Sequence, residues 1–174
     1  MVNFKNIKVV FFDVDGTVTD GIYQMSSEGV CTKSFYSKDF YGLESLLKSD
    51  IRVIIITQSD GRVIKQQINR IMEVRAIWKK KYCDCDLDLF THIEDKVERI
   101  EKYMEFKDIS WGNIAYVGDA ENDLESMKKC EFTACPNDAI EEVQEESNYI
   151  SNYDGGKGAV YDICKYILEK RKEK

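Results

Sequence analysis

The hydrophobic positions of this chain form two kinds of pattern that alternate along the sequence. Short apolar runs of strand length occupy Lys8–Phe12, Arg52–Ile56, Ala76–Trp78, Asn113–Val117 and Glu131–Ala134. Because these runs are apolar at most positions, they are typical of strands that are covered on both faces of a sheet. The pattern therefore predicts a set of parallel strands.

The stretches between several of these runs have apolar residues three and four positions apart, which is the spacing of an amphipathic helix. The three clearest apolar faces consist of Ile64, Ile68, Ile71 and Met72, of Ile93, Val97, Ile100 and Met104, and of Val160, Ile163, Cys164, Ile167 and Leu168. Alternating strands and helices predict an α/β fold, a Rossmann-like parallel sheet with helices on both faces. Sites in such sheets form at the carboxyl ends of the strands.

The segment Gly21–Tyr36 interrupts the alternation of strands and helices. Two β-prone runs flank Ser26–Gly29, so the segment predicts a β-hairpin inserted after the first strand. Because it follows directly after that strand, it should project from the edge of the sheet where the site forms. The segment Lys79–Phe90 is rich in charge and predicts a loop.

With 174 residues, one proline and no glycine–serine linker, the chain predicts a single domain over residues 1–174. Its formal net charge of −7 argues against nucleic-acid binding. No apolar stretch approaches the ~20 residues of a membrane span, and the N-terminus lacks the layout of a signal peptide. We therefore expect no membrane partner and a cytoplasmic location. The six cysteines are expected to be reduced, and His92 to be a polar loop residue.

Chemically useful side chains occur at four places where the predicted strands end or the next helix begins. These are Asp13 with Asp15, Thr57, Lys96, and Asp119 with Asp123. Each has a simpler interpretation by itself, since a lone lysine is usually a surface residue and paired acids often begin a helix. Because all four places lie at the same edge of the predicted sheet, together they indicate one site.

Phosphoryl transfer uses this combination of groups. A phosphate ester resists attack because its oxygens are negative, so catalysis depends on neutralising and positioning them. A carboxylate can act as the nucleophile and divide the reaction into two steps. Mg²⁺ prefers carboxylate oxygens and water, while a lysine and a hydroxyl can bind the remaining phosphate oxygens. The sequence therefore predicts a magnesium-dependent site for phosphate esters.

Four motifs, in order, resemble those of the haloacid dehalogenase superfamily: Asp13-Val14-Asp15-Gly16-Thr17, Thr57, Lys96 and Gly118-Asp119-x-x-Asn122-Asp123. The resemblance implies a phosphatase with Asp13 as the nucleophile and Asp15 as the general acid and base. It also implies that Thr57 and Lys96 bind phosphate.

The same resemblance implies how the metal is held. Asp13, the backbone carbonyl of Asp15 and Asp119 would bind Mg²⁺, and Asn122 and Asp123 would support them.

The intervals between Asp13, Thr57 and Lys96 are too short for the cap domain that many relatives carry. This resembles the capless group of 3-deoxy-D-manno-octulosonate 8-phosphate phosphatases and nonulosonate 9-phosphate phosphatases. The resemblance implies a phosphorylated sugar acid as substrate, and a homotetramer whose hairpin and C-terminal tail lie near neighbouring active sites. The resemblance to this group also includes three further motifs: Lys33-x-Phe35, Asp39-x-x-Gly42 and Gly155-Gly156-x-Gly158-Ala159-Val160. The residues predicted to bind substrate are Gly16, Lys33, Asp39, Thr57, Gln58, Arg62 and Lys96.

The second motif departs from the group's pattern. The octulosonate phosphatases usually continue it as Thr-Gly-Arg, whereas this chain has Thr57-Gln58-Ser59-Asp60, and Arg62 or Lys65 would have to replace the arginine. The alternatives are a nonulosonate 9-phosphate phosphatase, a phosphatase of another small phosphoester, and a non-catalytic assembly module like the phosphatase-like domain of acylneuraminate cytidylyltransferases. The intact acids and Lys96 argue against a module without activity.

Overall fold

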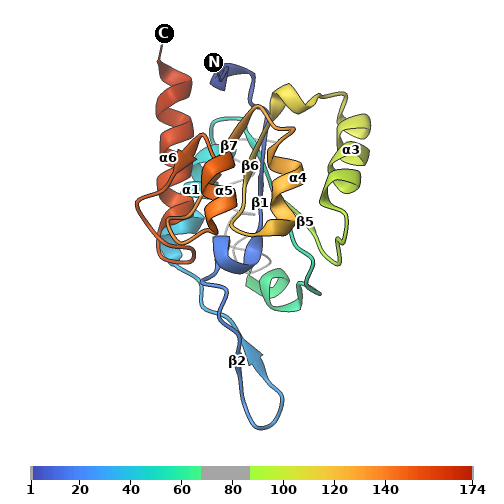
Figure 1. Cartoon of the computed structure of the whole chain (residues 1–174), viewed down its shortest axis with the longest axis vertical. Helices are drawn as coiled ribbons and strands as arrows, with labels where there is room; N and C mark the ends of the chain where they lie inside the picture. Colours follow the sequence, from blue (N-terminus) through green and yellow to red (C-terminus); the bar gives the residue numbers. More distant parts are fainter. Residues whose placement is uncertain (1, 68–86, 174) are drawn as a thin grey trace.

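The fold is built around a parallel sheet of six strands, as the computed structural model shows in Figure 1. The structure describes residues 2–67 and 87–173. The strand order is β5-β4-β1-β6-β7-β8, and each neighbouring pair is parallel. The strands are β1 (Val9–Phe12), β4 (Arg52–Ile56), β5 (Leu87–Phe90), β6 (Ile114–Val117), β7 (Phe132–Cys135) and β8 (Tyr149–Ile150).

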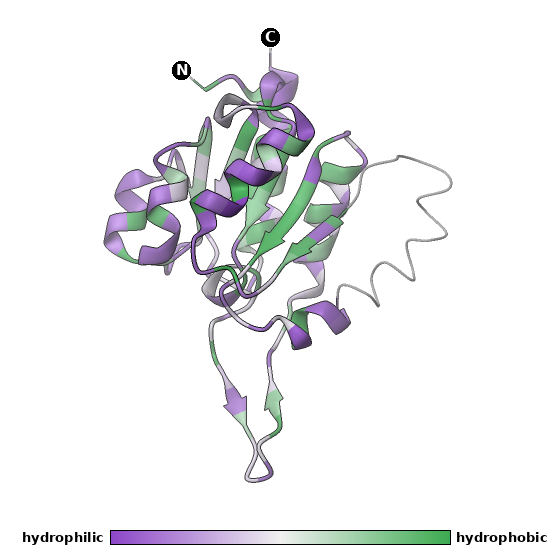
Figure 2. Ribbon diagram, turned by 90° about the vertical axis from the view of Figure 1, so that its right-hand side faces the viewer, coloured by the Kyte–Doolittle hydropathy of each residue, from purple (hydrophilic) through white to green (hydrophobic). Residues whose placement is uncertain are grey.

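Helices cover both faces of the sheet and leave its apolar strands in the middle, as Figure 2 shows. One face packs against α1 (Ser37–Leu47) and α6 (Ala159–Lys172), and the other against α3 (Lys96–Lys107), α4 (Leu124–Met127) and α5 (Glu141–Glu146). Along β1 the side chains alternate between the two layers, since Val10 and Phe12 join the first core and Val9 and Phe11 join the second. This confirms the predicted α/β fold.

The hairpin is a second, two-stranded sheet made of β2 (Gln24–Met25) and β3 (Cys31–Thr32), paired antiparallel. It projects from the carboxyl end of the main sheet, at the opposite end of the molecule from both termini (Figure 1). The prediction of a hairpin within Gly21–Tyr36 is confirmed. Within the described residues no other insertion forms a separate cap, and the remaining short turns are η1 (Phe4–Asn6), η2 (Val14–Val18), η3 (Trp111–Asn113) and η4 (Glu121–Asp123).

Some predicted elements differ from those observed. Leu87–Phe90 forms β5, so the prediction of a loop over the end of Lys79–Phe90 was wrong. The reason is that Leu87 and Leu89 alternate with Asp88 on an edge strand, and this half-apolar pattern does not stand out in a charged segment. The short strand β8 was not predicted. The predicted strand Ala76–Trp78 lies outside the described residues, and of its neighbouring predicted helix only residues 62–67 are described, as helical.

The described cysteines are free thiols, as expected: Cys31, Cys130, Cys135 and Cys164. His92 is an exposed loop residue with φ +57°. Over residues 2–67 and 87–173, no helix has both the length and the apolar character that a membrane span requires.

Candidate active site

The first part of the site is the turn that follows β1. The Asp13 N–H donates to the Val117 carbonyl at 2.9 Å, which ties the start of the turn to β6. The chain then turns through η2, where Gly16 has φ +95°. A Cβ atom at Gly16 would overlap the Asp119 carboxylate, so the turn requires glycine both for its backbone conformation and for this close approach.

Lys96 joins the two acidic strand ends. It is the first residue of α3, a helix that begins where the Asp95 side chain accepts from the Glu98 N–H. Its buried Nζ lies 2.5 Å from Asp13 Oδ1 and 2.6 Å from Asp123 Oδ1. The lysine is therefore a buried cation shared by two carboxylates.

The Asp123 carboxylate is fully occupied by hydrogen bonds. Besides Lys96, its Oδ1 accepts from the Tyr116 hydroxyl at 2.7 Å, and its Oδ2 accepts from the backbone N–H groups of Asp119 and Ala120 at 3.0 and 3.2 Å. These contacts hold the Gly118–Ala120 segment in place, and a Cβ at Gly118 would overlap Asp123. Asp123 therefore positions its neighbours.

The electrostatics of this cluster favour a bound cation. The carboxylate oxygens of Asp13, Asp119 and Asp123 lie within 4.8 Å of one another. Burial, with repulsion from Asp123, raises the pKa of Asp13 to about 8 against the attraction of Lys96. Burial also raises the pKa of Asp119 to about 6 against a hydrogen bond from the Thr17 hydroxyl. Three carboxylates beside one lysine leave excess negative charge in a buried place, and a divalent cation would compensate it.

The donor set fits magnesium. Asp13 uses Oδ1 for Lys96, and Asp119 uses Oδ1 for the Thr17 hydroxyl at 2.8 Å. Among the hydrogen bonds of the described residues, the Oδ2 atoms of Asp13 and Asp119 take part in none, so each can bind a metal. Hard oxygen donors of this kind, completed by water, suit Mg²⁺.

Lys96 keeps its charge in this environment. Burial lowers its pKa, but the attraction of Asp13 and Asp123 and the hydrogen bonds to them outweigh burial, so its pKa is raised. The cation is therefore present whenever the two acids are ionised.

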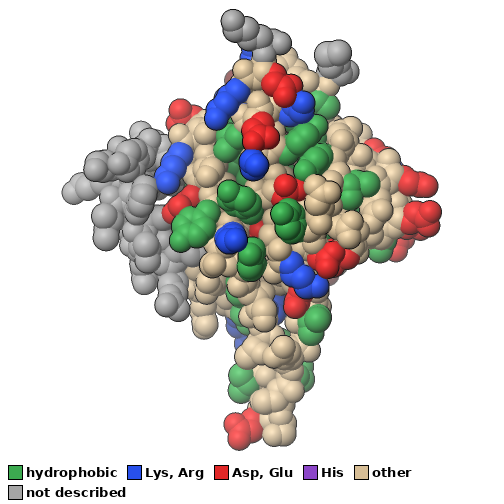
Figure 3. Space-filling view, turned by 90° about the vertical axis from the view of Figure 1, so that its left-hand side faces the viewer, with side chains coloured by type: hydrophobic (Ala, Val, Ile, Leu, Met, Phe, Trp, Pro, Cys, Tyr) green, Lys and Arg blue, Asp and Glu red, His purple; other side chains and the backbone are tan. Residues whose placement is uncertain are grey.

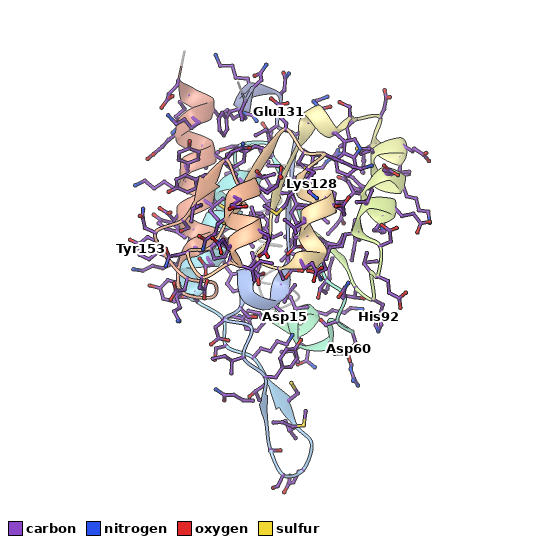
Figure 4. The ribbon with its side chains drawn as sticks, viewed as in Figure 1. Asp15, Asp60, His92, Lys128, Glu131 and Tyr153 are labelled. Atoms are coloured by element: carbon purple, nitrogen blue, oxygen red, sulfur yellow. The ribbon has the colours of Figure 1, made fainter. Side chains whose placement is uncertain are left out.

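Asp15 lies just beyond Asp13 and contacts the hairpin. Lys33 Nζ lies 2.5 Å from Asp15 Oδ1, and the Tyr23 hydroxyl donates to Asp15 Oδ2 at 2.8 Å. Burial lowers the pKa of Lys33, but its hydrogen bonds to Asp15 and Tyr23 raise the pKa overall. Figure 4 shows Asp15 where the hairpin joins the sheet, with Asp60 and His92 at the same end of the molecule and Glu131 at the opposite end.

Thr57 follows β4, the strand beside β1, and is buried. Its hydroxyl lies 3.0 Å from the Ser59 hydroxyl and accepts from the Ser59 N–H at 3.1 Å. Gln58 is exposed, and Arg62 is exposed with its Nε 2.6 Å from Asp60 Oδ2. The segment therefore presents a hydroxyl pair at the carboxyl end of the strand next to β1, and an exposed arginine.

The C-terminal glycine segment packs directly against the turn after β1. The Gly156 N–H donates to the Thr17 carbonyl at 3.1 Å, and the Gly155 N–H donates to Asp138 Oδ1 at 2.9 Å. A Cβ at Gly155 would overlap the Gly16 carbonyl. The two glycines therefore let a second loop lie against the backbone that carries Asp15 and Gly16.

Two predicted site residues take part in none of the hydrogen bonds described above. Asp39 is 1 % exposed, and its Oδ1 accepts from the Tyr161 N–H at 2.9 Å, so it holds the first turn of α6 instead of lining the site. Asn122 is exposed and lines a hollow beside α3 and α4, together with Lys96 and Glu94.

The structure also brings in residues that were not predicted as site residues: Thr17, Tyr23, Ser59 and Tyr116. Thr17 stood within the first motif, and its hydroxyl was a visible signal. Tyr116 lies inside an apolar strand, so the sequence pattern predicted a core residue and gave no sign that its hydroxyl contacts Asp123.

The chain matches the family model of haloacid dehalogenase-like hydrolases over residues 48–163, which is more than half of its length. Together with the parallel sheet and the acids at its carboxyl edge, this match shows that the chain belongs to the haloacid dehalogenase-like hydrolase family. It is an enzyme, a phosphoric monoester hydrolase, and its cofactor is Mg²⁺.

Particular relatives narrow the group that the chain resembles. It is 28% identical to 3-deoxy-D-manno-octulosonate 8-phosphate phosphatase KdsC of Escherichia coli, over 97% of this chain and 82% of that protein. The crystal structure of the phosphatase of that name from Yersinia pestis superposes with a TM-score of 0.83 and 26% identity, over 97% and 84% of the two chains. The one from Moraxella catarrhalis, in complex with magnesium, phosphate and KDO, has a TM-score of 0.81 and 30% identity, over 95% and 88%.

Proposed function

We propose that this protein hydrolyses the phosphate monoester of an acidic sugar, of the 3-deoxy-D-manno-octulosonate 8-phosphate type, through an aspartyl-phosphate on Asp13. The observation that carries the proposal is the cluster in which Lys96 pairs with Asp13 beside Asp119, with Asp15 next to it. The similarity to phosphatases of that sugar phosphate supports the choice of substrate.

In the first step an Asp13 carboxylate oxygen attacks phosphorus and the bond from phosphorus to the sugar oxygen breaks. Asp15 gives its proton to that oxygen, so the sugar leaves as an alcohol. In the second step Asp15 takes a proton from water as the water oxygen attacks phosphorus, which releases phosphate and restores Asp13. Lys96 and Thr57 bind the phosphate oxygens, and Lys96 also holds the nucleophile in position.

Asp13, the Asp15 carbonyl and Asp119 would hold magnesium, which neutralises phosphate charge when it is bound. Asp123 and Asn122 would support these metal ligands. Asp123 would do so by accepting from the backbone N–H of Asp119. Burial and the nearby Asp123 raise the pKa of Asp13. A metal cation beside Asp13 would therefore also favour the ionised carboxylate, which is the form that attacks phosphorus.

The sugar would lie in an open hollow of about 590 Å³ between the hairpin and the segment after β4. Its lining includes Tyr23, Lys33, Ser59, Asp60 and Arg62. Lys33 already contacts Asp15 and Arg62 already contacts Asp60, so each cation has an acid beside it. A sugar carboxylate that enters the hollow would compete with Asp60 for Arg62, the cation nearest the altered second motif. Gly16 and Gln58 are further proposed substrate contacts.

The altered second motif favours a second candidate, a nonulosonate 9-phosphate. Gln58 and Ser59 stand where the octulosonate phosphatases usually carry glycine and arginine after the threonine, so this chain lacks that arginine as a partner for the sugar carboxylate. The experiment is to measure phosphate release from a panel of sugar phosphates, including both acidic sugars, with magnesium and with EDTA. Asp13→Asn serves as the blank. Metal-dependent turnover of one acidic sugar supports the proposal, and turnover of neutral sugar phosphates alone contradicts the substrate class.

We also propose that the protein assembles as a homotetramer, with the hairpin and the C-terminal segment at the contacts. Four apolar hairpin residues are more than half exposed, with Met25 at 71%: Ile22, Tyr23, Met25 and Val30. Figure 3 shows hydrophobic side chains on the hairpin and on the face beside it, and Tyr153 lies at that side in Figure 4. A two-stranded hairpin with exposed apolar side chains gains stability from a covering surface. We propose a cytoplasmic location for this assembly.

Sedimentation at several concentrations tests the assembly. The double change Met25→Ser and Val30→Ser should reduce the sedimentation coefficient toward that of a monomer, while Phe106→Ser, at an exposed residue of α3, should leave it unchanged. A monomeric unaltered protein would contradict the tetramer.

A further inference from the structure

The two arms of the hairpin meet at a pair of residues close to the main sheet. Gln24 pairs with Thr32 and Met25 with Cys31, so the same antiparallel register places Tyr23 opposite Lys33. The two side chains also contact each other, since Lys33 Nζ lies 3.2 Å from the Tyr23 hydroxyl and 4.3 Å from the centre of its ring. Tyr23 and Lys33 therefore form the cross-strand pair at the base of the hairpin.

This pair contacts Asp15 through both of its carboxylate oxygens. Lys33 donates to Oδ1, the Tyr23 hydroxyl donates to Oδ2, and the Thr19 hydroxyl adds a longer contact to Oδ1 at 3.4 Å. The Lys33 side chain is 7% exposed although it belongs to a projecting hairpin. The base of the hairpin is thus closed around the acid of its own chain.

We propose that Tyr23 and Lys33 are positioning residues for Asp15, which fix the plane of its carboxyl group for proton transfer to the leaving oxygen. This inference rests on the proposed function, in which Asp15 is the general acid. It differs from the prediction that Lys33 binds substrate, because here Lys33 acts through Asp15.

The position of Asp15 explains why it needs such support. It stands in the turn after β1, with φ −85° and ψ 109°, and its side chain is partly exposed, so the strand does not fix its rotamer. Proton transfer depends on hydrogen-bond geometry at the leaving oxygen. Two donors from opposite hairpin arms hold both carboxylate oxygens and so restrict rotation about the side-chain bonds. A change in the hairpin therefore reaches the chemistry through this pair.

The test compares two substrates that differ in their need for a general acid. A sugar phosphate leaves as an alcohol and requires the proton, whereas p-nitrophenyl phosphate releases a stable phenolate without it. In Tyr23→Phe and Lys33→Met, kcat/KM for the sugar phosphate should fall about 10- to 100-fold. General acid catalysis typically contributes about 10²–10⁴-fold in rate, and a misplaced Asp15 would lose part of this. For p-nitrophenyl phosphate the fall should stay below about 3-fold, since kcat/KM covers the steps up to release of the leaving group. Tyr41→Phe and Lys38→Met, at exposed positions of α1, are the matched controls.

A second arm uses Asp15→Asn. In that background Tyr23→Phe should cause no further loss on the sugar phosphate, because residues that act through one group are not additive. Equal losses on both substrates, or a rise in KM at unchanged kcat, would overturn the inference and assign the pair to substrate binding. Absence of turnover by the unaltered enzyme would remove the proposed function itself, and with it this inference. If both variants keep the ratio of kcat/KM between the sugar phosphate and p-nitrophenyl phosphate that the unaltered enzyme has, the inference is wrong while the proposed function stands.

Discussion

Lys96 Nζ lies 2.5 Å from Asp13 Oδ1, although the two residues are 83 positions apart in the chain. The contact joins the first residue of α3 to the first residue after β1, and both side chains are buried. The same ammonium group also contacts Asp123, so one cation balances two of the three carboxylates in the cluster. A single side chain thereby connects Asp13, the proposed nucleophile, to the acids that follow β6.

Replacing Lys96 with methionine should lower the free energy of unfolding by about 3–5 kcal/mol in the absence of metal, because it leaves two buried carboxylates without their cation. Turnover should be lost as well. Urea unfolding in EDTA measures the first effect and phosphate release the second. Lys102→Met is the control, since Lys102 lies on the same helix and is 63% exposed at its side chain. Equal stability of the two variants would contradict the role of Lys96 as the buried counter-ion.

Replacing Asp13 with asparagine should lower turnover by at least about 10³-fold, because the amide cannot attack phosphorus. The fold should remain, and in EDTA near pH 8 the variant should be at least as stable as the unaltered protein. The reason is that burial and Asp123 already disfavour the charge on Asp13. Phosphate release and thermal unfolding are the measurements. Appreciable remaining turnover would exclude Asp13 as the nucleophile.

Replacing Asp119 with asparagine should raise the magnesium concentration needed for half-maximal activity by about 10- to 100-fold, since a charged oxygen ligand is lost. Magnesium should also stabilise the variant less than the unaltered protein against heat. Glu121→Gln, an exposed change nearby, should leave both readouts unchanged. An unaltered magnesium titration in Asp119→Asn would contradict its role as a ligand.

Asp39 should make stability depend on pH. Burial raises its pKa from 3.8 to about 6, against hydrogen bonds from the backbone of Tyr161 and Gly158. The folded protein therefore holds more protons than the unfolded chain between these values, so the stability from this group is full below pH 3.8 and is lost as pH rises through about 6. The full loss is about 3 kcal/mol at 1.36 kcal/mol per pKa unit.

Asparagine at position 39 can keep the acceptor for Tyr161 without the charge. Urea unfolding from pH 4 to 8 should show Asp39→Asn gaining on the unaltered protein as pH rises, with a plateau above about pH 7. Asp50→Asn is the control, because Asp50 is exposed and its φ of +57° suits asparagine. A constant difference across the range would show that Asp39 does not titrate in this window.

Replacing Gly155 with alanine should disturb the turn after β1, because the added methyl group would overlap the Gly16 carbonyl. We expect a loss of about 1–3 kcal/mol in stability and a loss of turnover of about 10-fold or more. Gly112→Ala is the matched control, since the atom nearest to its added Cβ is Ser110 Oγ at 3.6 Å. Unchanged activity in Gly155→Ala would show that the turn adapts without cost to the site.

The sequence could predict features that depend on local pattern. Arg52–Ile56 forms a strand over the predicted residues, and the hairpin turns where Ser26–Gly29 indicated. The same patterns could not reveal contacts between distant segments. Asp39 was assigned to substrate binding by resemblance, but its partner Tyr161 lies 122 positions away. The hydroxyl of Tyr116 was concealed because a tyrosine in an apolar strand resembles any other core residue, and its partner is fixed only by the turn through Gly118.

The contact between Gly155 and the Gly16 turn joins two segments that are synthesised far apart in time. A ribosome makes Asp13, Lys96 and Asp123 well before Gly155, so a growing chain that ends between Asp123 and Gly155 already carries every charged group of the cluster. It lacks the loop that lies against the turn and the helix α6 that covers one face of β1. The turn that carries Asp15 and Gly16 therefore acquires its packing partners only after β8, the last strand of the described sheet, has been synthesised.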